Sequence, residues 1–141
     1  MLGDHEVPSD FLEYVLWRTQ KAGLVVVLCA DQVPCGKYAA ESLGKAGVSV
    51  SPASKEENAK ATLSKVSIGE ADASIVYVTD VKASKGTASG VKIADEVNVV
   101  ATYPMGVVKD SQNAAAAKAW VHFVRSKDGQ KTLRKFGFLP P

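Results

Sequence analysis

Residues 24–43 read LVVVLCADQVPCGKYAAESL, and this stretch decides the fold. Its first seven residues, 24–30, form a continuous apolar run rich in valine, which is typical of a strand covered on both faces. Pro34 suits the first turn of a helix, and the residues after it keep helical spacing up to Gly44. A buried strand that runs directly into a helix favours a parallel sheet.

The rest of the chain alternates between helical and strand patterns. N-terminal to the opening stretch, Asp10 and Glu13 have capping-box spacing and predict a helix over 11–22. A second capping box, Ser54 with Glu57, predicts a helix that stops near Gly69. The other expected elements are strands at 48–51, 73–78 and 97–102, a loop at 82–91, extended chain at 105–108, a helix from Ser111 and a short helix ending near 136–138. The fold class is therefore α/β, with a mainly parallel sheet flanked by helices.

Two details of the C-terminal helices are also predicted. Gly129 is expected to separate the helix that begins at Ser111 from the last helix. The expected buried side of the first of these helices is Ala115, Ala119, Val121, Phe123 and Val124.

Length and composition narrow the class of protein. The chain has 141 residues, of which 46% are hydrophobic and 23% charged, with a net charge of +2, as in globular domains. The longest apolar run is far shorter than the ~20 residues that cross a bilayer, so no membrane span is expected. From Lys109 onward seven Lys or Arg face two Asp, but no aromatic residues interleave on a basic face and no nucleic-acid partner is expected. The start of the chain lacks the pattern of a secretory signal, which leaves a cytoplasmic location open.

Three features fall at places where open α/β sheets bind ligands, outside the carboxyl ends of the strands. The turn at 33–36 presents backbone N–H groups of Cys35 and Gly36, a helix starts around 57–59, and Tyr77 lies near the end of its expected strand. A cradle of N–H donors and one hydroxyl suits a small oxyanion. The alternative is that these features are a tight turn, a helix cap and a half-buried aromatic residue that bind nothing.

The two cysteines, Cys29 and Cys35, allow a second alternative. Their spacing is not a zinc pattern, and His5 and His122 lie far apart in the sequence. A thiol at a helix N-terminus has a lowered pKa, so Cys35 could serve a thiol enzyme, although no Cys-x-x-Cys or histidine motif supports it. A buried state or a disulfide between Cys29 and Cys35 is the other reading of this pair.

Several short motifs occur in an order that resembles the periplasmic molybdate-binding proteins of ABC importers. They are VPCGKYA at 33–39, ENAK at 57–60, GEADASIVYVTD at 69–80, YP at 103–104 and FGF at 136–138. The resemblance runs from about residue 24 to the C-terminus. It implies one lobe of a type II periplasmic-binding fold, in which two α/β lobes close on molybdate or tungstate. It also implies a binding protein rather than an enzyme, with no cofactor and no metal beyond the oxyanion, a permease as partner and a location outside the cytoplasmic membrane.

The resemblance also assigns site residues. In that family main-chain N–H groups and hydroxyls hold the oxyanion without a cationic side chain. Position by position, this implies the N–H of Cys35, the N–H of Ala59 and the hydroxyl of Tyr77. The family has an alanine-like residue where Cys35 stands, a change that a main-chain donor tolerates.

Compared with the family, the chain looks truncated, because the first lobe of the family should precede residue 24. The expected organisation is a non-family helical segment at 1–23, an oxyanion-binding lobe at 24–103, and a crossover strand with C-terminal helices at 104–141. We expect the orphaned helices to be covered by a homodimer that exchanges them or by the helix at 11–22. The alternative function is a truncated homologue that binds no ligand and acts as an interaction or oligomeric structural protein.

Overall fold

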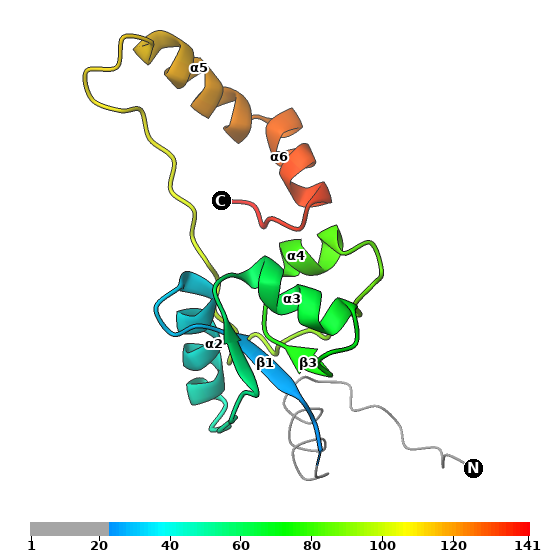
Figure 1. Cartoon of the computed structure of the whole chain (residues 1–141). Helices are drawn as coiled ribbons and strands as arrows, with labels where there is room; N and C mark the ends of the chain where they lie inside the picture. The colour runs from blue at the N-terminus through cyan, green and yellow to red at the C-terminus, as the bar shows by residue number, and fades with distance from the viewer. Residues whose placement is uncertain (1–22) are drawn as a thin grey trace. The chain divides into compact units, whose positions relative to one another are not determined.

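The computed structural model describes residues 23–141 of the chain (Figure 1). It consists of two compact units, one ending at Val100 and the other spanning Ala101–Pro141. The helix predicted over 11–22 and almost all of the segment 1–23 lie outside the described residues.

A three-stranded parallel sheet forms the centre of the first unit. Its strands are β1 (Val26–Cys29), β2 (Ser54–Glu56) and β3 (Ala73–Ser74), in the order β2-β1-β3. The central strand β1 is apolar along its whole length because it has a neighbour on each side and helices packed against it. The predicted α/β class with a parallel sheet is confirmed.

Three helices accompany the sheet: α2 (Pro34–Lys45), α3 (Ala59–Ser67) and the short α4 (Val78–Ala83). Both α2 and α3 pack on β1, one to each side of it in Figure 1. Leu28, Ala39 and Leu43 form the core between β1 and α2, so the helix predicted after Pro34 is confirmed.

Strand β2 does not lie where the sequence predicted it. Residues 48–51 form no strand, and Ser54, expected to cap a helix with Glu57, begins β2 instead. Long-range pairing explains the difference, because the Ala53 N–H donates to the Val26 carbonyl at 2.7 Å and Ser54 pairs with Val27. The Ser54 hydroxyl donates to the Glu56 carboxylate at 2.6 Å rather than receiving a helix N–H. The predicted capping box is therefore wrong.

The strand prediction at 73–78 is right only for its first two residues, and residues 97–102 form no strand. Val78, expected to end a strand, begins α4, which also takes up the first residues of the loop expected at 82–91. Within the described residues, segment 97–102 has no strand partner, although its apolar pattern alone favoured one. A strand requires a neighbouring ladder of hydrogen bonds, which the local pattern does not supply.

The second unit contains α5 (Ala114–Arg125) and α6 (Lys127–Lys135). The helices are separated at Ser126, whose extended backbone and hydroxyl cap α6, and Gly129 lies in the first turn of α6 rather than between the helices. No residue of α5 is buried, and of its predicted buried side Ala115, Ala119 and Phe123 are exposed while Val121 and Val124 are half-buried. None of the described helices has both the length and the apolarity needed to span a bilayer.

Candidate oxyanion site

The candidate site lies at the carboxyl edge of the parallel sheet. Each strand there is followed by a helix: β1 leads to α2, β2 to α3, and β3 to α4. Because the three strands are parallel, the N-terminal ends of these helices follow the same edge of the sheet. Cys35 is the second residue of α2, Ala59 is the first residue of α3, and Tyr77 is the N-cap of α4.

Close packing holds the start of α2 against the end of β1. Pro34 occupies the first helical position, where the missing N–H would have no partner within the helix. Gly36 is buried, and a Cβ atom at this position would collide with the carbonyl oxygens of Ala30 and Cys29. Glycine at position 36 therefore lets the first turn of α2 approach β1 more closely than a residue with a side chain would allow.

The first turn of α2 leaves one amide unpaired. The N–H groups of Gly36 and Lys37 both donate to the Val33 carbonyl at 3.1 Å. Within the described part of the chain, the Cys35 N–H has no protein acceptor. It belongs to the positive end of a helix of 12 residues, where an anion is favoured.

The start of α3 is arranged in the same way. Asn58 caps the helix: its side-chain oxygen accepts the Ala61 N–H at 2.9 Å and its carbonyl accepts the Thr62 N–H at 3.1 Å. The N–H groups of Ala59 and Lys60 find no acceptor among residues 23–141. Two helices thus present unpaired amides at one edge of the sheet.

Tyr77 is positioned by its neighbours on α2 and α4. Its ring meets the ring of Tyr38 edge to face, with centroids 6.3 Å apart and planes at 74°. Its N–H donates to the Asp80 carboxylate at 3.3 Å. Partial burial raises the pKa of the Asp80 carboxyl above its ordinary value, and the hydrogen bond from Tyr77 offsets this only in part.

The predicted site residues are not all gathered in one cavity. Cys35 and Tyr77 line the same small cavity of about 50 Å³, together with Tyr38, Val76 and several further residues of the first unit. Ala59 does not line it. The structure therefore brings two of the three predicted residues together and leaves the third at the neighbouring helix start.

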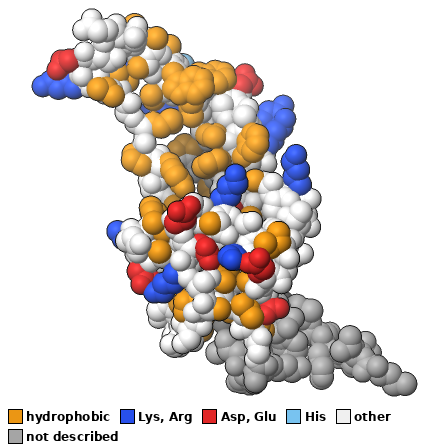
Figure 2. Space-filling view, viewed as in Figure 1, with side chains coloured by type: hydrophobic (Ala, Val, Ile, Leu, Met, Phe, Trp, Pro, Cys, Tyr) orange, Lys and Arg blue, Asp and Glu red, His pale blue; other side chains and the backbone are white. Residues whose placement is uncertain are grey.

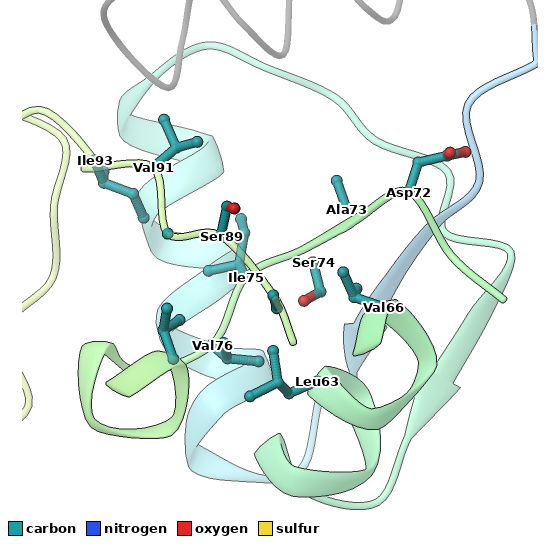
Figure 3. A pocket seen from close by; sticks show the side chains of 13 residues that line it. Leu63, Val66, Asp72, Ala73, Ser74, Ile75, Val76, Ser89, Val91 and Ile93 are labelled. Atoms are coloured by element: carbon teal, nitrogen blue, oxygen red, sulfur yellow. The ribbon is translucent and has the colours of Figure 1, made fainter. Parts of the chain in front are cut away.

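A larger cavity of about 130 Å³ lies beside β3 (Figure 3). Its walls are mostly apolar, including Leu63, Val66 and Val76, and it contains none of the three predicted residues. The Asp72 carboxylate at its rim accepts the Val25 N–H at 2.8 Å. This cavity offers an anion neither unpaired amides of a helix start nor a cationic side chain, so it is not the candidate site.

A disulfide joins Cys29 to Cys35, with their Cα atoms 5.8 Å apart. Neither cysteine therefore has a thiol, and a nucleophilic Cys35 finds no support in this structure. No group of residues among 23–141 has the arrangement of a metal site.

Sequence reasoning did not assign the roles of three residues that shape the site: Asn58, Thr62 and Asp80. Asn58 was recognisable, because asparagine directly before a helical pattern is a strong N-cap signal, but the capping box predicted at Ser54 competed with it. Thr62 contacts Cys29, 33 positions away, so no local pattern points to it. Asp80 lies three positions after Tyr77 and accepts its N–H, a local helix-start contact that the strand predicted over 73–78 left unrecognised.

Comparison with known proteins identifies the family of the chain. Residues 9–139 match the family described as bacterial extracellular solute-binding protein, so the match extends into the N-terminal segment predicted to lie outside the resemblance. The chain is 32% identical over 121 residues to the molybdate-binding protein ModA of Mycobacterium tuberculosis H37Rv, an alignment that covers 86% of this chain and 46% of the relative. No solved structure was found to match the chain.

Two further relatives have similar coverage. ModA of Escherichia coli K12 is 30% identical over 119 residues, covering 82% of this chain and 46% of that protein. A putative ABC transporter substrate-binding lipoprotein of Bacillus subtilis 168, YvgL, is 33% identical over 115 residues, covering 77% of this chain and 43% of that protein. The chain thus spans about half the length of the curated relatives that it matches. By these matches the chain belongs to the bacterial extracellular solute-binding protein family, and its small parallel sheet flanked by helices corresponds to one lobe of a periplasmic-binding-protein fold.

Proposed function

We propose that this chain binds a tetrahedral oxyanion of the molybdate type at the carboxyl edge of its sheet. The donors are the N–H of Cys35, the N–H of Ala59 and the hydroxyl of Tyr77. The observation that carries the proposal is the pair of unpaired amides at the starts of α2 and α3, both following strands of one parallel sheet. Relatives from Mycobacterium tuberculosis and Escherichia coli named as molybdate-binding proteins support the choice of ligand.

The donor set suits an anion that carries no proton. Backbone N–H groups can donate hydrogen bonds but cannot accept them. Every oxygen of a fully ionised molybdate or tungstate can accept from such a donor, whereas the O–H of a protonated anion would find no acceptor among these amides. Fixed amide dipoles at helix starts also need no reorganisation on binding. Molybdate and tungstate fit the same donors, and we propose both as ligands.

The chain spans about half the length of its relatives, and we propose that it supplies only part of the donors of a two-lobed site. Each hydrogen bond to a charged group contributes about 1.5–3 kcal/mol, so a chain that supplies part of the donor set binds its anion more weakly by several powers of ten. We propose that the partner of this protein is the permease of an ABC importer. We also propose that the protein lies outside the cytoplasmic membrane. The family description and the name of the Bacillus subtilis relative support both proposals.

The test is the substitution Tyr77→Phe, which keeps the ring and removes the hydroxyl. Isothermal titration of the full chain with molybdate should give a dissociation constant about tenfold to a hundredfold larger for Tyr77→Phe than for the unsubstituted chain. Sulfate serves as the ligand control. Tyr38→Phe is the matched variant, because Tyr38 packs on Tyr77 but is not a proposed donor, and its binding should not change.

Absence of saturable heat with molybdate and tungstate at millimolar concentration would contradict the proposal. Equal loss of binding in Tyr77→Phe and Tyr38→Phe would contradict the assignment of the Tyr77 hydroxyl.

A second candidate function is interaction through the C-terminal unit, in the form of a homodimer. Exposed side chains support it: Trp120 is 63% exposed, Phe136 62% and Leu139 68%. Hydrophobic side chains gather on this unit in Figure 2. Apolar side chains of this size favour burial against a partner.

A further inference from the structure

The Cys29–Cys35 disulfide closes the turn that carries one of the proposed donors. Cys29 is the last residue of β1 and is 1% exposed, and Cys35 lies in the first turn of α2 and is 6% exposed. The bond therefore ties the end of the central strand directly to the residue that carries the unpaired N–H of α2. The two cysteines are six positions apart in the sequence, so along the chain the disulfide constrains mainly the turn between β1 and α2.

The same disulfide is in contact with the other donor helix. The Cys29 sulfur lies 3.2 Å from the Thr62 hydroxyl oxygen, and Thr62, in the first turn of α3, is fully buried. The Thr62 hydroxyl donates to the Asn58 carbonyl at 2.9 Å, and Asn58 is the cap directly before Ala59. A continuous chain of covalent and close contacts thus runs from Cys35 through Cys29, Thr62 and Asn58 to Ala59.

We propose that the disulfide and Thr62 act as one positioning unit, which holds the Cys35 and Ala59 amides at a fixed separation and makes oxyanion affinity depend on the redox state of the cysteine pair. The proposal rests on the proposed function and adds its regulation. The side chains of Cys29, Cys35 and Thr62 do not touch the anion in this proposal; they act by positioning the backbone that carries the donor amides.

The redox step is an exchange with a dithiol reductant. One thiolate of the dithiol attacks the protein disulfide, the S–S bond breaks, and the second thiol closes the reductant into its own disulfide. Two electrons and two protons end on the sulfur atoms of Cys29 and Cys35, so the protein is reduced and the dithiol is oxidised.

Reduction changes both ends of the positioning unit. The turn after β1 loses its cross-link and gains conformational freedom. The Cys29 sulfur, which in the disulfide can only accept, gains an S–H that can donate to the Thr62 hydroxyl and reorganise its bond to Asn58. The Cys35 and Ala59 amides then lose their fixed positions. Anion binding must order them again, which lowers the affinity.

The first test is titration of the full chain with molybdate, oxidised and in dithiothreitol. We expect the dissociation constant to rise about tenfold on reduction, as for a typical coupling between two sites. Cys35→Ala, which keeps the amide but removes the disulfide, should bind like the reduced chain. Thr62→Val should also bind weakly, and Thr62→Ser, which keeps the hydroxyl, should restore affinity.

The second test does not need ligand. Amide hydrogen exchange should become about tenfold faster on reduction at Lys37, which bonds to Val33, and at Thr62, which bonds to Asn58. The Ala117 amide, bonded to Asn113 in the C-terminal unit, is the control and should not change.

The outcomes separate the two proposals. Equal dissociation constants in both redox states overturn the redox dependence, and faster exchange at Lys37 without a change at Thr62 overturns the coupling between the two helix starts. Absence of saturable molybdate binding in the oxidised chain refutes the proposed function, and the exchange at Thr62 then decides the positioning unit alone.

Discussion

At the scale of single residues, the environment of Asp80 predicts how the stability of the chain depends on pH. Partial burial raises the pKa of its carboxyl, so the folded chain holds the proton more tightly than the unfolded chain, whose value is near 3.8. The free energy of unfolding should therefore fall as pH rises from about 4 through the folded pKa, and should not fall further from this cause at higher pH.

Asp80→Asn tests this prediction, because the amide oxygen can still accept the Tyr77 N–H without a charge. Urea unfolding at a series of pH values should show a smaller decrease across this window and equal or greater stability at neutral pH. Asp110→Asn, at an exposed carboxylate of the other unit, should leave the pH dependence as it is. A steeper decrease in Asp80→Asn than in the unsubstituted chain would refute the assignment.

At the scale of secondary-structure elements, the packing of α2 against β1 depends on glycine at position 36. Gly36→Ala places a Cβ against the Ala30 and Cys29 carbonyl oxygens, which must move apart. We expect a loss of about 1–3 kcal/mol in the free energy of unfolding, typical of an overpacked interior, measured by urea denaturation.

The same helix supplies the matched control. At Gly44 an added Cβ meets nothing within 4 Å, so Gly44→Ala should raise stability by up to about 1 kcal/mol through helix propensity. If the two substitutions had the same effect, close packing of α2 on β1 would not be the reason for glycine at position 36.

For the whole molecule, the exposed apolar side chains of the C-terminal unit predict self-association. The rings of Trp120 and Phe123 lie 5.8 Å apart on α5, and both are more than half exposed. Burial of such a side chain contributes about 1.5–3 kcal/mol, so replacing both by serine should weaken a dimer at least tenfold.

Sedimentation velocity over a range of micromolar concentrations measures this effect. Val91→Ser, at an exposed apolar position of the first unit, serves as the control and should leave association unchanged. A chain that sediments as a monomer at every concentration would exclude the homodimer as a function of this unit.

The sequence alone determined the parts of this protein whose causes are local. An apolar run, a proline in the first helical turn and helical spacing were enough to predict β1 and α2, and the order of five short motifs was enough to identify the family. Cys35 and Ala59 were placed at helix starts, where the structure has them, whereas Tyr77, expected near the end of a strand, is the N-cap of α4.

Only the tertiary structure decided what depends on partners far apart in the chain. Pairing with β1 turned Ser54 from an expected helix cap into the start of β2, and the lack of a ladder left residues 97–102 without a strand. Packing likewise brought Thr62 to the disulfide across 33 positions. A hydrogen-bond ladder or a buried contact needs two segments. The sequence of one segment alone therefore does not determine whether it forms a strand or which residues it contacts.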